Sequence, residues 1–132
     1  TKNIIEGKEI VLYNNGKMRR DFTYVDDVVK AVVALLKVKT SYGKERDNGS
    51  RYKIYNIGNS QPITLTRFVR AIERATGAKA NVRYDAMQPG DVKETYASCA
   101  AIEKVIKWRP ETPIDLGIEK YVEWFKEYYK SG

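Results

Sequence analysis

The stretch Arg19-Arg20-Asp21-Phe22-Thr23-Tyr24-Val25-Asp26-Asp27-Val28 decides how this chain is interpreted, because it joins two cations, an aromatic strand and the start of a helix. Asp26 or Asp27 is well placed to cap that helix, since a carboxylate at this position accepts a backbone N–H. A cation at the mouth of a strand–helix unit is suited to bind an anion such as phosphate. The alternative is that Arg19 and Arg20 are solvated surface charges.

The helix that follows is apolar around most of its circumference. Its apolar residues are Val28, Val29, Ala31, Val32, Val33, Leu35 and Leu36. A helix that is hydrophobic on nearly all sides is a buried one. We therefore expect this helix to lie inside the core.

The length and composition are those of one globular domain. The chain has 132 residues, of which 42% are hydrophobic and 31% charged, so it can form a core and lacks the composition of a disordered protein. Cys99 is the single cysteine, which excludes an intrachain disulfide. Histidine is absent, and with it the most common metal ligand, so we expect no metal site.

The net charge of +7 raises the question of nucleic-acid binding. Lysines and arginines are mixed with aspartates and glutamates along the chain, without a block of like charge or a nucleic-acid motif. We therefore expect a generally basic surface and no nucleic-acid partner, with a basic nucleic-acid-binding module as the alternative. The sequence has neither a long apolar window nor a secretion signal, so we predict a cytoplasmic protein with no membrane partner.

Short elements are predicted in the first part of the chain. Residues 1–7 have the pattern of a helix end that stops at Gly7. Residues 10–13 predict a strand, and residues 14–17 predict a hairpin turn into a second strand at residues 21–25.

The middle of the chain alternates loops with regular elements. Residues 39–50 are polar and contain glycine, which predicts a surface loop, and residues 51–57 predict a strand. Thr64 is an N-cap for a helix that ends at Gly77, and residues 81–84 predict a further short strand.

Two helices are predicted after a loop at residues 87–91. Ser98 is expected to cap the first of them. Thr112 as N-cap, Pro113 as the first helical residue and Asp115 form a near capping box for the second. One stripe of that last helix is predicted to be core: Ile114, Ile118, Tyr121, Val122, Phe125, and Tyr128 or Tyr129.

Common catalytic motifs are absent from the sequence. It contains no glycine-rich dinucleotide loop, no Walker loop, no serine-hydrolase elbow and no helical pair of metal ligands. Cys99 has no histidine partner, and we expect a small buried side chain there rather than a nucleophile.

Three stretches in this order resemble the C-terminal part of the extended short-chain dehydrogenase/reductases that act on nucleotide sugars, above all UDP-glucuronate 4-epimerases. They are Glu6-Gly7-Lys8 through Arg20-Asp21-Phe22-Thr23-Tyr24-Val25-Asp26-Asp27, then Tyr55-Asn56-Ile57-Gly58-Asn59-Ser60, then Met87-Gln88-Pro89-Gly90-Asp91-Val92 followed by Lys107-Trp108-Arg109-Pro110. The ordered set covers nearly the whole chain and is specific, although each stretch alone is weak.

The resemblance implies an α/β fold in which residues 1–132 form the C-terminal substrate-binding lobe, together with the last strand–helix elements of a Rossmann-type fold. The N-terminal NAD-binding part, with its glycine-rich motif and its catalytic Tyr-x-x-x-Lys pair, is expected to be absent from this chain. NAD is then the cofactor of the parent enzyme, bound outside this chain. The chain alone is expected to be inactive and to hold no catalytic residue.

The resemblance also implies five substrate-binding residues. Arg20 corresponds to the arginine that binds the nucleotide diphosphate, and its guanidinium suits adjacent phosphate oxygens. Val11 and Tyr13 correspond to the strand that receives the uracil, although ordinary strand packing is an equal alternative for them. Gln88 lies where many relatives have a second phosphate-binding arginine, and Asp91 corresponds to an aspartate near the ribose.

The neutral Gln88 favours the branch that acts on acidic sugars, with a UDP-sugar such as UDP-glucuronate as the partner. The leading hypothesis is therefore an NAD-dependent 4-epimerase, and the alternative is a nucleotide-sugar 4,6-dehydratase or decarboxylase. We expect a homodimer for the parent enzyme. For the chain on its own we expect self-association, because the apolar helix at residues 28–36 would lack its Rossmann cover.

Overall fold

The computed structural model describes residues 1–38 and 53–129, so the loop predicted at residues 39–50 lies outside the described residues. The fold is mixed α/β, as predicted. Its elements in chain order are α1 (Lys2–Ile5), β1 (Glu9–Leu12), the 3₁₀ turn η1 (Tyr13–Gly16), β2 (Arg19–Arg20), α2 (Val25–Leu36), β3 (Ile63–Thr64), α3 (Leu65–Thr76), β4 (Asn81–Tyr84), α4 (Ala100–Ile106) and α5 (Ile114–Tyr129).

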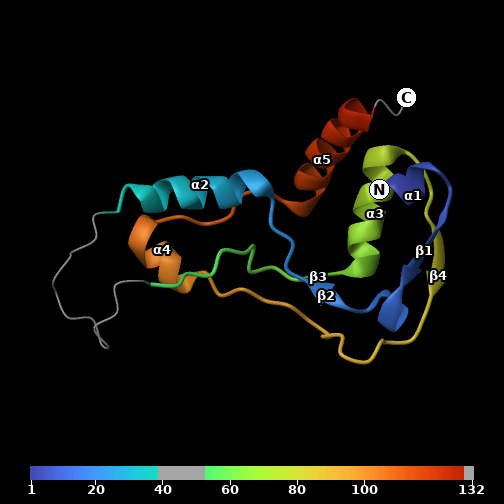
Figure 1. Ribbon diagram of the computed structural model, residues 1–132, viewed down its shortest axis with the longest axis horizontal. Helices are drawn as coiled ribbons and strands as arrows, with labels where there is room; N and C mark the ends of the chain where they lie inside the picture. Colours follow the sequence, from blue (N-terminus) through green and yellow to red (C-terminus); the bar gives the residue numbers. More distant parts are fainter. Residues whose placement is uncertain (39–52, 130–132) are drawn as a thin grey trace.

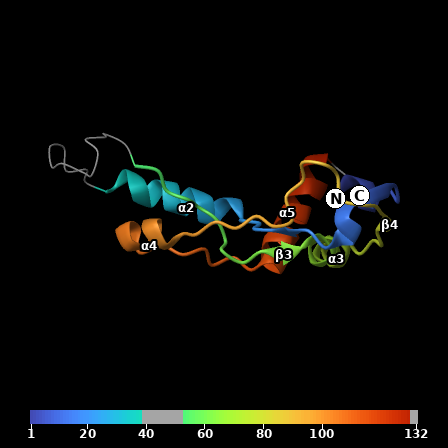
Figure 2. The same ribbon diagram turned by 90° about the horizontal axis from the view of Figure 1, so that it is seen from below.

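The elements form an elongated molecule with two ends (Figure 1). Helices α1, α3 and α5 lie together with β1 and β4 at one end, where the two strands form the outer edge, and α2 lies beside α4 at the other end, as Figure 2 shows again from below. No helix of the described residues is long and apolar enough to cross a bilayer. Each end has a core of its own.

The larger core fills the end that contains α3 and α5. Its buried side chains come from α1, β1, α3 and α5: Ile4, Leu12, Val69, Ala71, Ile72, Ile118 and Val122. The smaller core lies between α2 and α4 and consists of Ala31, Cys99, Ile102 and Trp108. Cys99 is 7% exposed, which confirms the prediction of a buried side chain at this position.

The hairpin predicted at residues 10–25 is wrong. Strand β1 pairs in parallel with β4, so that Val11 faces Arg83 across the ladder, although the two strands are far apart in the sequence. Strand β2 pairs antiparallel with β3. The turn residues after β1 instead form η1, in which Asn14 and Asn15 have φ angles of 51° and 52°. Asparagine adopts this left-handed conformation more readily than most residues, and here it turns the chain away from β1 rather than back along it.

Two further strand predictions are wrong. Residues 21–24 lie outside any regular element, and so do residues 53–57, the described part of the predicted strand at 51–57. Both stretches have the composition of a strand, but a strand forms only where an adjacent strand can accept and donate its backbone hydrogen bonds. The strand predicted at residues 81–84 is confirmed as β4.

Helix α3 forms as its sequence predicts. The Thr64 Oγ1 atom accepts a hydrogen bond of 3.2 Å from the Arg67 backbone N–H, which satisfies one free donor of the first turn. At the other end Gly77 has a φ angle of 75° and closes the helix. Gly7 ends α1 with a φ angle of 67°, also as predicted.

Helix α2 corrects two predictions. It begins at Val25 with Tyr24 in the N-cap position, so Asp26 and Asp27 lie in the first turn and neither is the cap. The helix is also not buried, because Ala31 and Asp27 are its only buried residues among those described. Its exposed apolar side chains are Val25, Val29, Val32, Val33 and Leu36.

The starts of α4 and α5 also differ from prediction. Cys99, rather than Ser98, occupies the N-cap position of α4. The Thr112 backbone N–H donates to the Asp27 carboxylate at 3.0 Å, which replaces the predicted capping box with Asp115. Helix α5 begins at Ile114, one residue after Pro113.

The predicted apolar stripe of α5 is only partly core. Ile118, Val122 and Phe125 are buried. Tyr121, Tyr128 and Tyr129 are exposed, and their rings pack on neighbouring aromatic rings of the same helix. Helical spacing alone does not tell which of two adjacent stripes faces the core.

Asp115 joins α5 to α3 and should make stability depend on acid pH. Its carboxylate accepts hydrogen bonds from Arg67 and Arg74, and the bond from Arg67 is the main cause that lowers the pKa of Asp115 below the ordinary value of 3.8. A lowered pKa stabilises the folded state above the ordinary value, and this contribution is lost as the pH falls through the lowered pKa. We expect Asp115→Asn to reduce the free energy of unfolding at pH 7 by about 1 kcal/mol, since the group is partly solvated.

Urea denaturation of both proteins between pH 7 and pH 2 measures this difference. It should shrink toward zero in the acid range, whereas the exposed control Glu111→Gln should change little at any pH. A difference for Asp115→Asn that does not vary with pH would contradict the assignment.

Gly58 allows two segments near the smaller core to approach closely. A Cβ atom on Gly58 would lie 2.4 Å from the Ala97 Cβ, far inside van der Waals contact. The Gly58 N–H also donates to the Cys99 Sγ at 3.2 Å. We expect Gly58→Ala to lower the free energy of unfolding by about 1–3 kcal/mol, because one of the segments must shift.

Denaturant unfolding measures this loss, and Gly90→Ala provides a control. Gly90 has open space around its Cβ position but a φ angle of 87°, so that variant carries backbone strain without the collision. A Gly58→Ala protein as stable as the wild type would show that the two segments separate at no cost.

Candidate functional site

The five predicted substrate-binding residues lie on two segments, residues 11–20 and 85–95, which we call the paired segments. The first tie between them is at the ends of β1 and β4. The Asp85 N–H donates to the Leu12 carbonyl at 3.1 Å, and the Asn15 N–H donates to the Asp85 carbonyl at 3.0 Å. These bonds continue the β1–β4 pairing past the last strand residues.

The second tie lies at β2. The Arg19 N–H donates to the Lys93 carbonyl at 2.9 Å, and the Thr95 N–H donates to the Arg19 carbonyl at 3.1 Å. Gln88 and Asp91 are located on the stretch between the two ties. The backbone thus brings Val11, Tyr13 and Arg20 from one segment alongside Gln88 and Asp91 from the other.

The turn after β1 is locked by close packing. Gly16 is buried with a φ angle of 71°, and a Cβ atom there would lie 2.5 Å from the Thr66 Oγ1. The Thr66 hydroxyl donates to the Gly16 carbonyl at 3.0 Å. Glycine is therefore required at this position, and the turn fixes where the segment leaves Tyr13.

Val11 and Tyr13 are half-buried. Val11 belongs to the β1–β4 ladder, and Tyr13 is the first residue of η1, between Leu12 and Asn15, which form the first tie. Both the strand-packing reading and the uracil reading are compatible with this position.

Gln88 and Asp91 stand at the two ends of one tight turn. The Asp91 N–H donates to the Gln88 carbonyl at 3.2 Å, and Gly90 between them has a φ angle of 87°. A turn with Pro89 second and a left-handed glycine third has the features of type II. Gln88 is exposed and Asp91 is half-buried, so the turn holds an amide and a carboxylate at the surface of the paired segments.

Arg19 and Arg20 have different roles. The Arg19 guanidinium forms an ion pair with Glu94 at 3.1 Å and donates to the Pro62 carbonyl at 2.8 Å. The half-buried Arg20 side chain donates to the Arg19 carbonyl at 2.8 Å and contacts the Met18 sulfur at 3.5 Å. Within the described residues, no carboxylate lies within ion-pair distance of Arg20. Arg19 therefore joins parts of the fold, whereas Arg20 keeps donors for an anion.

Two carboxylates of the same stretch have positions that the sequence analysis missed. Asp21 is half-buried and accepts backbone hydrogen bonds from Ser60, Gln61 and Ala97. Asp27 is 1% exposed and accepts the bond from Thr112. The sequence places Asp21 and Asp27 close to Arg19 and Arg20. Helix capping is a local explanation for Asp27, and it gives no sign of the distant partner Thr112.

The turn after β1 lacks two features that are typical of an NAD site. Tyr13 and Lys17 have the Tyr-x-x-x-Lys spacing, but the chain between them is the η1 turn rather than a helix, where residues four apart share a face. The turn that follows β1 has the sequence Tyr-Asn-Asn-Gly and lacks the glycine pattern that lets a backbone approach a pyrophosphate. The first of the paired segments therefore has neither the helical Tyr–Lys pair nor the glycine-rich turn.

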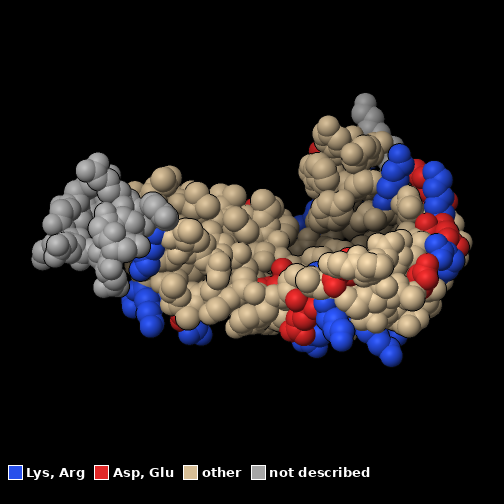
Figure 3. All heavy atoms as spheres, turned by 60° about the horizontal axis from the view of Figure 1, so that its bottom comes forward, with Lys and Arg blue, Asp and Glu red and all other residues tan. Residues whose placement is uncertain are grey.

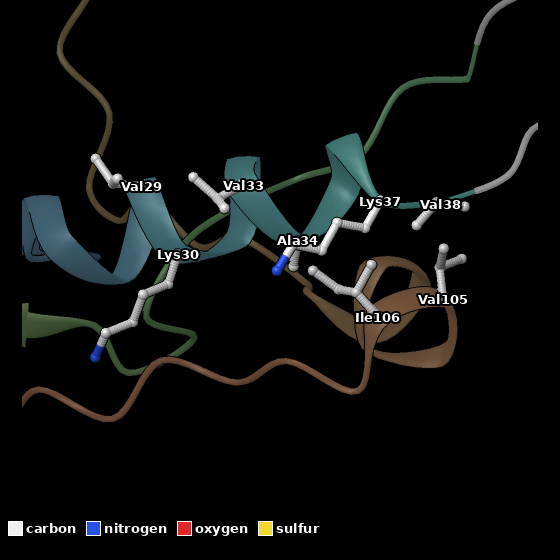
Figure 4. Close-up of a pocket in the computed structure, with 8 residues that line it drawn as sticks. All are labelled: Val29, Lys30, Val33, Ala34, Lys37, Val38, Val105 and Ile106. Carbon is white, nitrogen blue, oxygen red and sulfur yellow. The ribbon is translucent and has the colours of Figure 1, made fainter.

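A groove away from the paired segments lies between α2 and α4 (Figure 4). It has a volume of about 490 Å³ and is lined mostly by apolar side chains, among them Val29, Val33, Val105 and Ile106, with the stems of Lys30 and Lys37 at its border. Anion binding needs converging polar donors, which this groove lacks among the described residues. The groove is part of the apolar surface of α2.

Charged side chains are unevenly spread over the face that Figure 3 shows. Lysines, arginines, aspartates and glutamates alternate at the end that contains α1 and β4, whereas the α2–α4 end has a broad uncharged area. Many arginines are ion-paired, namely Arg19, Arg67, Arg74, Arg83 and Arg109. This mixed pattern differs from the basic stripe of a nucleic-acid-binding surface.

Known proteins match this chain along nearly its whole length. The family model described as GDP-mannose 4,6 dehydratase matches residues 1–121. Protein CapI of Staphylococcus aureus is 47% identical over 138 residues, which cover 98% of this chain and 41% of CapI. The probable UDP-glucuronate 4-epimerase of Rhizobium meliloti (strain 1021) is 35% identical over 136 residues, which cover 96% of this chain and 40% of that protein.

A solved structure agrees with these matches. The crystal structure of UDP-glucuronic acid 4-epimerase from Bacillus cereus, in complex with UDP-glucuronic acid and NAD, has a TM-score of 0.80 and 25% identity, over 97% of this chain and 38% of that one. The chain thus spans about two fifths of the length of the relatives it matches. NAD is the cofactor in solved relatives, as predicted. The resemblance is confirmed, and the chain belongs to the GDP-mannose 4,6 dehydratase family of NAD-dependent epimerases and dehydratases.

Proposed function

We propose that residues 1–132 are the substrate-binding part of an NAD-dependent 4-epimerase that acts on a UDP-sugar, with UDP-glucuronate as the leading candidate. The observation that carries the proposal is the guanidinium of Arg20, which has no carboxylate partner in the described residues and belongs to the paired segments. Relatives described as UDP-glucuronate 4-epimerases, one of them solved with UDP-glucuronic acid, support the choice of sugar.

The proposed binding mode divides the nucleotide among the paired segments. Arg20 donates to the diphosphate oxygens, because a planar guanidinium can contact two of them at once. Val11 and Tyr13 hold the uracil at the end of β1. Gln88 donates a neutral hydrogen bond to phosphate, and Asp91 at the other end of its turn accepts from the ribose.

The chemical step lies outside this chain in the proposal. When bound, NAD would accept and return a hydride, and in the proposal it is held by residues beyond these 132, since the turn after β1 lacks the glycine pattern of a dinucleotide site. This chain orients the sugar nucleotide for that step and is inactive by itself. The full-length protein is a homodimer in the proposal.

A 4,6-dehydratase acting on a nucleotide sugar is the second candidate, because the matching family model carries that description. A decarboxylase that acts on a nucleotide sugar is the third candidate. The binding residues proposed above would serve each of these enzymes, since all of them hold the nucleotide while other residues act on the sugar. Product analysis with UDP-glucuronate distinguishes an epimerase, which leaves the mass of the sugar unchanged, from a decarboxylase, which releases CO2. A 4,6-dehydratase needs a hydroxyl group at C6, so it is assayed with a neutral hexose nucleotide, from which it removes water.

The Arg20→Ala variant tests the proposed diphosphate contact. We expect UDP affinity in the full-length protein to fall about ten- to a hundredfold, which corresponds to the roughly 1.5–3 kcal/mol of a hydrogen bond to a charged group. NAD affinity and folding should stay nearly unchanged. Arg20→Lys should restore only part of the loss, since a point charge cannot reproduce the planar fork.

Isothermal titration calorimetry with UDP measures these affinities. Arg70→Ala is the matched control, because it removes the same charge from an exposed position on α3. Equal UDP affinities in wild type and Arg20→Ala would refute the site. A similar loss in Arg70→Ala would mean that only the overall charge matters.

The exposed apolar face of α2 leads to a proposal about assembly. Val25, Val29 and Leu36 are 60%, 52% and 81% exposed, and the apolar groove extends this face to α4. Apolar patches of this kind are seldom left in water. We therefore propose that the 132-residue chain, when it is prepared alone, self-associates through α2.

Sedimentation velocity across the micromolar range measures this assembly. We expect concentration-dependent dimers or larger species, and we expect Val29→Lys to shift them toward monomer because it places a charge in the apolar face. A single monomeric species of the unaltered chain over the whole range would contradict the proposal.

A further inference from the structure

The Asp21 carboxylate is a meeting point for three segments of the chain. Its Oδ2 accepts from the Ser60 N–H at 3.0 Å and from the Ala97 N–H at 3.0 Å, and its Oδ1 accepts from the Gln61 N–H at 3.2 Å. Its own backbone N–H donates to the Thr95 Oγ1 at 3.1 Å. Four hydrogen bonds therefore hold the residue that directly follows Arg20.

The segments that donate to Asp21 are shaped for this contact. Ser60 has a φ angle of 55°, an uncommon value for serine, and its hydroxyl donates to the Ala97 carbonyl at 2.7 Å. Gly58 allows the two segments to touch. Backbone strain and close packing at one place are retained when the surrounding contacts determine them. The Asp21 carboxylate is one of these contacts, and a Cβ atom on Gly58 would lie 2.9 Å from its Oδ2.

Anchoring Asp21 also restricts Arg20. Arg20 is the last residue of β2 and Asp21 follows it directly, so the hydrogen bonds of Asp21 fix the backbone from which the Arg20 side chain extends. All three hydrogen bonds to the Asp21 carboxylate come from backbone donors, and none comes from Arg20. The carboxylate is thus held by backbone N–H groups instead of neutralising the adjacent guanidinium.

We propose that Asp21 is a positioning residue that aims the Arg20 guanidinium at the diphosphate of the substrate. The inference rests on the proposed function, because it concerns the same anion site. Asp21 touches no part of the substrate in this proposal. It acts through the backbone that it holds, and its loss should allow Arg20 several orientations.

The Asp21→Asn variant is the test, since it keeps the shape and removes the charge and one acceptor. We expect UDP affinity in the full-length protein to fall about five- to tenfold, because a misdirected contact loses much of its effect. Asp27→Asn is the matched control. Asp27 also accepts a backbone hydrogen bond, from Thr112, so this variant should lower stability and leave UDP affinity unchanged.

A double-mutant cycle separates positioning from general destabilisation. If Asp21 acts through Arg20, Arg20→Ala combined with Asp21→Asn should bind UDP no more weakly than Arg20→Ala alone. Fully additive losses would overturn the inference. Unchanged affinity in Asp21→Asn, beside a clear loss in Arg20→Ala, would overturn the inference and leave the proposed function intact. Unchanged affinity in Arg20→Ala would overturn the proposed function itself.

Ser60→Ala covers the case in which Asp21→Asn fails to fold. This variant keeps the backbone donor to Asp21 and removes the hydroxyl bond to the Ala97 carbonyl. Without this bond the segments at Ser60 and Ala97 hold the Asp21 carboxylate less firmly. We therefore expect UDP affinity to fall about two- to threefold in a folded protein. An unchanged affinity in this variant would count against the inference.

Discussion

Two carboxylates within seven residues bind backbone N–H groups of segments that are distant in the sequence. Asp21 binds the backbone at Ser60, Gln61 and Ala97, and Asp27 binds the backbone at Thr112. The sheets are small, since each has two short strands. When a carboxylate accepts hydrogen bonds from backbone N–H groups, these bonds offset the free-energy cost of removing both the carboxylate and the N–H groups from water. These bonds add to the β2–β3 pairing and to the Arg19 backbone bonds in the region between the two ends of the molecule.

The two ends differ in how well they are covered. At the α3–α5 end, side chains of four elements form the core, and the ion pairs of Asp115 join α5 to α3 at the surface. The α2–α4 end has a smaller core, and most of the α2 circumference is left exposed. A helix with valines on several faces is stabilised by burial on several faces. The exposed valines are thus the part of this surface that most needs a partner.

In the candidate site the neighbouring residues Arg19 and Arg20 make different contacts. Arg19 is taken up by Glu94 and the Pro62 carbonyl, which leaves Arg20 as the available cation. Backbone bonds at both ends of the paired segments set the distance between them, and the turn at Gly90 presents Gln88 and Asp91. The polar side chains can then vary in chemistry without a change in the backbone that holds them.

The sequence by itself determined the local features whose cause lies within a few residues. Thr64 and Gly77 bound α3, Gly7 ends α1, and Cys99 is buried, because caps, left-handed glycines and small apolar side chains act at short range. The ordered motifs also identify the family, and the family model that matches residues 1–121 confirms it. Arg20 was distinguished from Arg19 only through that resemblance.

Only the tertiary structure decided which strand pairs with which, since β1 and β4 are joined by bonds between residues some seventy positions apart, such as Val11 and Arg83. It also decided the hydrogen-bond partners of Asp21 and Asp27. Local sequence patterns give Asp21 no partner and indicate only a helix cap for Asp27. The same holds for α2, whose composition is that of a buried helix although most of its valines face outward in this chain. Periodicity shows that a face is apolar, but what covers the face depends on segments distant in the sequence.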